Sequence, residues 1–184
     1  MNLLVSNYQY ICSNKNKKPM NKQILLSTLA IVLFSTISFA QNRTLPNKEV
    51  KTLDGSKFNI TDLENDGNPI VISFWATWCK PCKKELNNIA EVYEDWQDET
   101  SVTLVAISID DTRSMMRVAP YVNASEWEYE VYLDPNGELK RAMGVSTVPH
   151  TFLLNGKNEI VWQHKGYVEG DEDELLEEIE KLEK

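Results

Sequence analysis

An apolar strand followed at once by two closely spaced cysteines most constrains the fold of this chain. Residues 69–75 read Pro-Ile-Val-Ile-Ser-Phe-Trp, a continuous apolar run rich in β-branched residues. Such a run is typical of a central strand buried on both faces of a sheet. The motif Trp78-Cys79-Lys80-Pro81-Cys82 comes next. After it, apolar residues recur at spacings of three and four (Leu86, Ile89, Ala90, Tyr93 and Trp96), which predicts an amphipathic helix.

A second apolar run completes a β-α-β unit. Residues 102–109 read Val-Thr-Leu-Val-Ala-Ile-Ser-Ile and predict another buried strand. The connection between two parallel strands of one sheet is almost always right-handed. We therefore expect the cysteines to lie in the loop between the first strand and the helix, at the helix N-terminus.

The remaining pattern predicts a hairpin before this unit and an α-β segment, a short helix, a hairpin and a helix after it. Asp54-Gly55 is a two-residue turn signal between strands at 50–53 and 56–59. A helix is expected over 112–122, kinked or ended by Pro120. The later elements are a strand at 129–133, a helix at 138–143, strands at 151–154 and 159–164, and an acidic helix at 171–184 that Gly170-Asp171 can cap.

The first forty residues differ in character from the rest. Residues 24–40 are apolar, four lysines precede them, and Ser38-Phe39-Ala40 places small residues at a cleavage site. This pattern predicts a signal peptide over 20–40 that is cleaved after Ala40. The alternative is an uncleaved membrane anchor, because about 17 apolar residues are the lower limit for spanning a bilayer. Residues 1–19 are interpreted as a non-native or unstructured extension, with translation starting at Met20.

Charge and cysteine count narrow the function of the expected domain, residues 41–184. It carries 15 Lys and Arg against 28 Asp and Glu, a net charge of −13, which disfavours nucleic acid and anionic membranes as partners. Loss of the leader removes Cys12 and leaves Cys79 and Cys82. An exported compartment permits disulfides, but a bridge across so short a loop stabilises little. The pair therefore indicates redox chemistry, and we expect an exported, periplasmic or extracytoplasmic monomer.

The position of the two cysteines assigns them unequal roles. Unpaired N–H groups and the macrodipole at a helix N-terminus favour an anion, and Lys80 adds positive potential. Thiols in such settings have pKa values of about 3.5–7.5. Cys79 is thus the predicted nucleophile, and Cys82, one turn deeper, resolves the mixed disulfide. Pro81 is tolerated in a first helical turn and helps to hold the sulfurs in register.

Two segments together resemble the thioredoxin superfamily, and more narrowly the exported TlpA/ResA-like thiol-disulfide oxidoreductases. They are Phe-Trp-Ala-Thr-Trp-Cys-Lys-Pro-Cys-Lys-Lys-Glu at 74–85 and Gly-Val-Ser-Thr-Val-Pro-His-Thr-Phe-Leu-Leu at 144–154. The resemblance implies an α/β, thioredoxin-like fold: a central mixed sheet flanked by helices, with an N-terminal β-hairpin and a central α-β insertion. It also implies a cis-proline at Pro149, client hydrogen bonds from the Val148 backbone and a catalytic role for Glu85. Trp78, beside Cys79, is a candidate for client contact, and the alternative is that it packs around the cysteine loop.

One position departs from thioredoxin itself. Where thioredoxin carries a buried Asp in the strand before the motif, this chain has Ser73. A serine cannot act as a base at neutral pH, so Glu85 or water must accept the proton of Cys82.

The sequence leaves the direction of electron flow open. A reductase of exported disulfide proteins, possible clients of which include apocytochrome c, needs electrons from a membrane thiol donor. A disulfide-forming oxidase uses the same residues, because direction depends on the reduction potential. A third hypothesis is a metal carrier that binds through the two thiolates. A structural zinc site usually has four ligands, and here only His150 could join the two cysteines. We expect no cofactor besides the Cys79–Cys82 pair and no metal.

Overall fold

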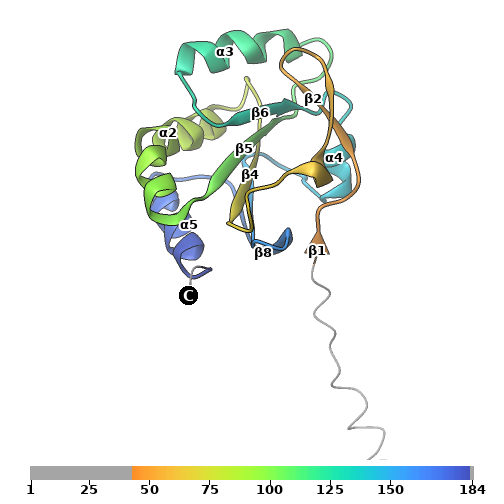
Figure 1. Cartoon of the computed structure of the whole chain (residues 1–184). Coiled ribbons are helices and arrows are strands. Elements are labelled where there is room, and N and C mark those ends of the chain that lie inside the picture. The colour runs from red at the N-terminus through yellow and green to blue at the C-terminus, as the bar shows by residue number, and fades with distance from the viewer. Residues whose placement is uncertain (1–42, 183–184) are drawn as a thin grey trace, which may run out of the picture. The chain divides into compact units, whose positions relative to one another are not determined.

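The computed structural model describes residues 43–182, which form an α/β fold around one mixed sheet (Figure 1). Within this range the sheet order is β1-β8-β7-β4-β5-β6-β2-β3. The strands are β1 (Arg43–Thr44), β2 (Glu49–Thr52), β3 (Lys57–Asn59), β4 (Ile70–Trp75), β5 (Thr103–Ser108), β6 (Glu130–Leu133), β7 (His150–Leu154) and β8 (Glu159–Lys165). The helices are α2 (Lys80–Thr100), α3 (Val118–Ser125), α4 (Glu138–Ala142) and α5 (Asp171–Glu180), with 3-10 turns η1 (Ile60–Asp62) and η2 (Met115–Arg117).

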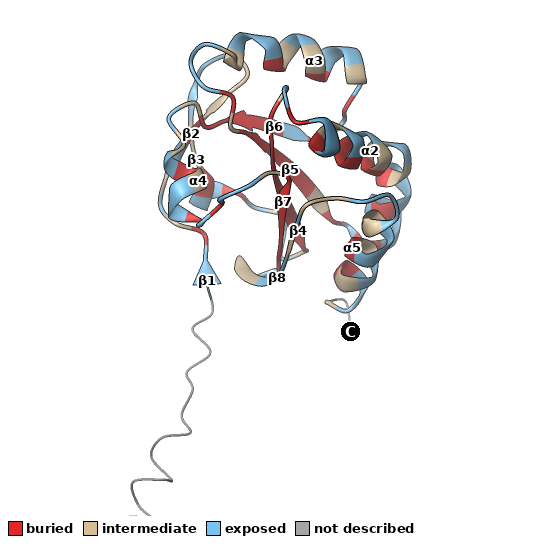
Figure 2. Ribbon diagram, turned by 180° about the vertical axis from the view of Figure 1, so that it is seen from behind, coloured by how far each residue is buried: buried red, intermediate tan, exposed pale blue. Residues whose placement is uncertain are grey.

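Strand β4 lies at the centre of the sheet, as its unbroken apolar sequence predicts. All six of its residues are buried, and it pairs in parallel with β5 and antiparallel with β7. In Figure 2, β4, β5 and β7 are largely red and the outer surfaces of the helices are pale. The β4-α2-β5 unit is therefore confirmed, and it places residues 76–79 at the edge of the sheet where its parallel strands end.

The two faces of the sheet have separate apolar cores. Alternate residues of β4 point to opposite faces, so Val71 and Trp75 pack on one side and Ile72 and Phe74 on the other. Helices α2, α3 and α5 cover the first face with residues that include Leu86, Val118, Val122, Leu175 and Ile179. Helix α4 and the N-terminal segment cover the second face with residues that include Leu45, Val50, Ile60 and Leu139.

The N-terminal hairpin and the insertion meet in the sheet. Strand β6 continues the parallel order beyond β5, and β2 then pairs antiparallel with β6. The predicted hairpin and α-β insertion are confirmed, and the sheet explains why both occur in one chain: the hairpin covers the edge that β6 would otherwise expose. The thioredoxin-like fold class is thus confirmed.

The structure corrects one local prediction, bears out a second in part and adds a strand. Pro120 lies in the first turn of α3, which begins at Val118, because a proline is tolerated where no intrahelical N–H bond is needed. Gly170 is the N-cap of α5, as predicted, but no side chain caps the helix, and Asp171 instead accepts a hydrogen bond from the Val168 N–H at 2.8 Å. Strand β1 was not predicted, because two exposed residues carry no periodicity.

The leader predictions cannot be compared with the fold. Residues 1–19, the signal peptide or anchor at 20–40 and Cys12 all lie outside the described residues. Within residues 43–182, no helix has the length and apolar character needed to cross a membrane.

Candidate functional site: a disulfide at a helix N-terminus

Cys79 and Cys82 form a disulfide at the start of α2, with their Cα atoms 5.4 Å apart. Cys79 is the N-cap residue, and its sulfur accepts a hydrogen bond from the Cys82 N–H at 3.3 Å. Cys79 is 5% exposed and Cys82 is fully buried. The prediction that Cys82 is the more deeply buried of the two is confirmed. A sulfur at Cys79 therefore receives an N–H donor as well as the positive end of the helix dipole.

The residues around the pair form an exposed rim. Trp78 is 62% exposed, although most large apolar side chains of the fold are buried. Lys80 and Pro81 are exposed in the first turn of α2. The next two lysines extend to opposite flanks: the Lys83 ammonium lies 5.3 Å from the centroid of the Tyr121 ring, and Lys84 pairs with Glu169 at 2.6 Å.

The second predicted segment reaches the same edge of the sheet. The Val148–Pro149 peptide bond is cis, as the resemblance implied. His150, the next residue, pairs with Phe74 near the end of β4. Pro149 is buried, its carbonyl accepts the Gly166 N–H at 2.9 Å, and Val148 packs against the core that contains both cysteines. The structure thus brings Trp78, Val148 and Pro149 to the edge that carries the disulfide.

Glu85 is buried in α2, one helical turn after Cys82. It is 5% exposed, and its carboxylate accepts hydrogen bonds from Thr151 Oγ1 at 2.7 Å and Ser73 Oγ at 3.2 Å. Burial raises the pKa of Glu85 to about 7, against the lowering effect of the two hydroxyls and with a smaller raising effect from Asp171 and Glu172. Ser73 stands where thioredoxin has a buried acid, and here its hydroxyl contacts Glu85, an acid that comes from α2.

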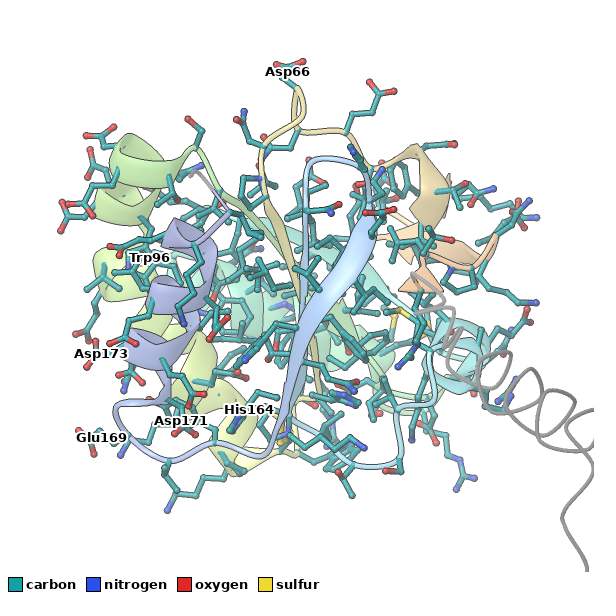
Figure 3. The ribbon with its side chains drawn as sticks, turned by 90° about the horizontal axis from the view of Figure 1, so that it is seen from below. Asp66, Trp96, His164, Glu169, Asp171 and Asp173 are labelled. Carbon is teal, nitrogen blue, oxygen red and sulfur yellow. A yellow bond between two sulfur atoms is a disulfide. The ribbon has the colours of Figure 1, made fainter. Side chains whose placement is uncertain are left out.

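A small cavity adjoins the Glu85 carboxyl. Its volume of about 10 Å³ is room for about one water molecule. Its lining includes Glu85, Thr151, His164, Asp171 and Glu172. His164 Nε2 lies 3.3 Å from the Asp171 carboxylate, and Figure 3 shows the two side chains next to each other at the start of α5. Polar groups therefore continue from Glu85 towards the partly exposed His164.

A second buried carboxylate, Asp110, lies on the other side of the cysteine loop. It follows β5, is fully buried, and accepts hydrogen bonds from both the backbone N–H and the hydroxyl of Thr77, each at 2.7 Å. Ser108 Oγ donates a third at 2.9 Å. Thr77 lies two residues before Cys79, so Asp110 is tied directly to the reactive loop.

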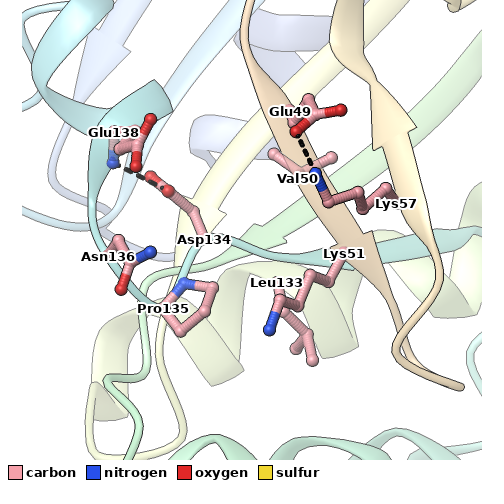
Figure 4. A pocket seen from close by; sticks show the side chains of 9 residues that line it. All are labelled: Glu49, Val50, Lys51, Lys57, Leu133, Asp134, Pro135, Asn136 and Glu138. Atoms are coloured by element: carbon pink, nitrogen blue, oxygen red, sulfur yellow. Dashed lines mark hydrogen bonds and ion pairs between the residues drawn. The ribbon is translucent and has the colours of Figure 1, made fainter.

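Two other features lie apart from the sulfurs. A cavity of about 240 Å³ opens between β2, β3 and the Asp134-Pro135-Asn136 turn, and its lining in Figure 4 contains no cysteine. The side chain of His150 stacks on Phe152 in the core on the opposite face of the sheet from α2. Among residues 43–182, no group of three or more His, Cys, Asp or Glu side chains is placed to hold a metal ion.

The cysteines were predicted from the sequence pattern, and Pro149 and Glu85 from the resemblance, but Thr151 and Asp110 were missed. Thr151 is a polar residue that precedes the apolar Phe152, Leu153 and Leu154 of the predicted strand, which is a signal that its side chain needs a buried partner. Asp110 directly follows a buried parallel strand next to the strand that leads to the cysteines. Side chains in that position gather at the functional edge of such sheets. Both signals were present, but neither identifies the partner.

Comparisons with known proteins agree with this site. The model of the AhpC/TSA family matches residues 42–163. The thiol-disulfide oxidoreductase ResA of Bacillus thuringiensis is 31% identical over 137 residues, which cover 74% of this chain and 75% of that protein.

Two solved structures are similar across the domain. A thioredoxin-like protein from Porphyromonas gingivalis has 48% identity and a TM-score of 0.68, and the match covers 75% of this chain and 90% of that one. StoA from Bacillus subtilis has 26% identity and a TM-score of 0.57, over 72% of this chain and 98% of that one. With its cysteine pair at a helix N-terminus, the chain belongs to the AhpC/TSA family of thioredoxin-like proteins and is a thiol-disulfide oxidoreductase similar to ResA and StoA.

Proposed function

We propose that this protein reduces disulfides of exported proteins through the Cys79–Cys82 dithiol and a mixed-disulfide intermediate. The observation that carries the proposal is the asymmetry of the pair: Cys79 is the N-cap of α2, and Cys82 is fully buried one turn later. The helix terminus stabilises a thiolate at Cys79. Burial keeps Cys82 from reacting with a client before Cys79 does.

The reaction proceeds in two exchanges. The Cys79 thiolate attacks one sulfur of the client disulfide, whose S–S bond breaks and releases the other sulfur as a thiolate. Cys82 then loses its proton and attacks the Cys79 sulfur, which restores the internal disulfide and releases the second client thiolate. Two electrons pass from the enzyme dithiol to the client, and a donor dithiol must later reduce the enzyme again.

Glu85 is proposed as the group that accepts the proton of Cys82. The two residues are three apart in α2 and so lie on the same face of the helix. A carboxyl with a pKa of about 7 can both take up and release a proton near neutral pH. The cavity beside it gives the proton a path towards His164 and solvent.

Client contact is proposed for Trp78, Val148 and Pro149. A large exposed indole next to the nucleophile offers apolar area to an unfolded client segment. The segment before β7 lies beside the end of β4, so the Val148 backbone can pair with an extended chain that brings its disulfide to Cys79. Lys80 and Pro81 shape the loop between the two sulfurs.

The compartment and partners are proposals of the same kind. The leader pattern supports an exported enzyme, periplasmic or extracytoplasmic, free or anchored through 24–40. We propose a membrane thiol as its electron donor and apocytochrome c as one class of client, which would give the enzyme a part in cytochrome c maturation. We propose a monomer.

The test is a disulfide-reduction assay on insulin with dithiothreitol as donor. Cys79→Ser is expected to abolish activity. Cys82→Ser, reduced and then freed of dithiothreitol before insulin is added, is expected to stop after the first exchange and to accumulate mixed disulfides that mass spectrometry identifies. In the full chain of 184 residues, which keeps the third cysteine, Cys12→Ser is the matched control and should retain full activity. Full activity of Cys79→Ser would overturn the proposal.

The direction of exchange has its own measurement. A reduction potential near that of thioredoxin, about −270 mV, supports reduction, whereas a value near −120 mV, as in strong oxidants, supports the disulfide-forming alternative. Metal analysis of the reduced protein tests the carrier alternative.

A further inference from the structure

Asp110 is a buried acid that the exchange chemistry above does not use. It is fully buried, and none of the ion pairs in the described part of the chain includes it. Burying a carboxylate without a cation is costly unless several donors surround it. Here there are three donors, and two of them belong to Thr77.

The two bonds from Thr77 define a fixed geometry. The Thr77 N–H binds Oδ2 of Asp110 and the Thr77 hydroxyl binds Oδ1, so one residue occupies both carboxylate oxygens. Asp110 is itself fixed, because the Ile109 N–H binds the Trp75 carbonyl at 2.8 Å and the Asp110 N–H binds Ser108 Oγ at 3.2 Å. Thr77 is thus held against the end of β5.

The loop around Thr77 has few other restraints before the helix begins. The Cys79 N–H binds the Ala76 carbonyl at 3.0 Å, which closes a turn over residues 76–79. Thr77 is the second residue of that turn, and Trp78 after it points to solvent. The position of the Cys79 sulfur therefore depends on how Thr77 is held.

We propose that Asp110 is a positioning residue for the exchange reaction: by binding Thr77 at two atoms, it holds the 76–79 turn in the geometry that presents Cys79 to a client disulfide. This inference rests on the exchange function proposed above, because it gives Asp110 a part in the same reaction. Asp110 acts through Thr77 and does not touch the reacting sulfurs. A displacement of about 1 Å at a reacting atom can slow a reaction about 100-fold.

Two substitutions of Asp110 separate positioning from simple stability. Asp110→Ala removes all three bonds. Asp110→Asn keeps the shape: its Oδ1 can accept from the Thr77 N–H and Ser108, and its Nδ2 can donate to the Thr77 hydroxyl. Ser108→Ala is the matched control, because it removes one donor to the same carboxylate and leaves both bonds to Thr77.

The experiment uses the full chain with Cys12→Ser in every variant, so that only the site cysteines react. Reduced protein is mixed with 5,5′-dithiobis(2-nitrobenzoate), and the second-order rate constant is measured by stopped flow. The equilibrium constant against dithiothreitol and the melting temperature are recorded in parallel. The reference is the protein that carries Cys12→Ser alone. Relative to it, we expect Asp110→Ala to slow exchange at least tenfold. Asp110→Asn and Ser108→Ala should react within about twofold of its rate.

The outcomes decide between distinct failures. If the reference reacts and a folded Asp110→Ala reacts as fast, the positioning role is wrong and the exchange function stands. If Asp110→Asn is as slow as Asp110→Ala, the geometry of Thr77 is not the cause, and the role is also wrong. If the reference has no exchange that depends on Cys79, the proposed function itself fails. Should Asp110→Ala not fold, Thr77→Val must be slower than Ser108→Ala, and equal rates would overturn the role.

Discussion

Two buried carboxylates lie on either side of the cysteine loop, and they are bound in different ways. Glu85 follows Cys82 in α2 and accepts hydrogen bonds from two side-chain hydroxyls, those of Ser73 and Thr151. Asp110 follows β5 and accepts from two hydroxyls and from the backbone N–H of Thr77. The first adjoins a cavity that leads towards solvent, and the second binds the loop itself. These surroundings match the two roles proposed above, in which Glu85 exchanges a proton and Asp110 holds the nucleophile in place.

The kind of hydrogen-bond donor around each carboxylate explains why the two acids suit different roles. A hydroxyl can turn and accept, so Ser73 and Thr151 can also satisfy a protonated Glu85. A backbone N–H can only donate, so Thr77 requires an accepting oxygen at one fixed point. Substitutions at the two acids and at their hydrogen-bond donors test whether Glu85 and Asp110 act independently of each other.

The largest expected effect is on stability. The pKa of Glu85 is about 7 in the fold against an ordinary value of 4.5. Between these values the folded state binds more protons than the unfolded state, so Glu85 makes stability fall as the pH rises from 4.5 to 7. The loss amounts to at most about 3 kcal/mol. Glu85→Gln removes this pH dependence. Between pH 4.5 and 7, the free energy of unfolding of the variant should therefore rise relative to that of the wild type by about 3 kcal/mol.

Urea unfolding of the oxidised protein between pH 4 and 8 measures this gain. Glu91→Gln is the matched control, because Glu91 is exposed on the same helix. The pKa of Glu85 would not be raised in the fold if the stability difference between Glu85→Gln and the wild type stayed constant with pH.

The second prediction concerns rate. If Glu85 accepts the proton of Cys82, Glu85→Gln should slow the resolution of the mixed disulfide about 100-fold at pH 7, the low end of general base catalysis. The first attack by Cys79 should change little, which separates Glu85 from Asp110. Rapid acid quench of a preformed mixed disulfide measures resolution alone. Equal slowing of both steps would show that Glu85 acts on the whole site.

The chain's own sequence explains why one acid was predicted and the other was not. Glu85 was predicted from the resemblance, which implied a role for an acid three residues after Cys82, and helical spacing puts the two on one face. The β-α-β order followed from the apolar runs, because each run is long and unbroken. Asp110 is 33 positions from Thr77, and its contact depends on the parallel register of β4 and β5, which pairs Trp75 with Ser108. A single sequence gives the strands but not that register.

The same reasoning applies to the helix predicted over 112–122. Pro120 was expected to kink or end that helix, and it lies in the first turn of α3 instead. A proline is acceptable at either place, and only the packing of Val118 and Val122 on the core decides between them. Local sequence patterns were therefore sufficient to predict the β-α-β unit that carries the cysteines. The start of α3 in the insertion depends on tertiary packing, which the local pattern does not contain.

A smaller effect is expected from the hydroxyls that bind Glu85. Both stabilise its charged form, and Thr151 does so more strongly than Ser73. Thr151→Val should raise the pKa of Glu85 by about one pH unit, since a hydrogen bond to a charged group contributes about 1.5–3 kcal/mol. Ser73→Ala should raise it less. The pH midpoint of mixed-disulfide resolution reports the change. A larger effect from Ser73→Ala would reverse the order of the two donors.

The smallest effect is expected from the Thr77 hydroxyl, which is one of the three donors to Asp110. Thr77→Val removes the hydroxyl bond to Asp110 and keeps the backbone N–H bond, so we expect the first exchange to slow about threefold and stability to fall by about 1 kcal/mol. The pH midpoint of resolution should not move, because Thr77 shares no hydrogen-bond partner with Glu85. In the double variant with Glu85→Gln, the two changes in the free energy of unfolding, one a gain and one a loss, should add to within about 0.5 kcal/mol, as for independent sites. A larger coupling would mean that the two acids act as one network, and the division between proton exchange and positioning would have to be given up.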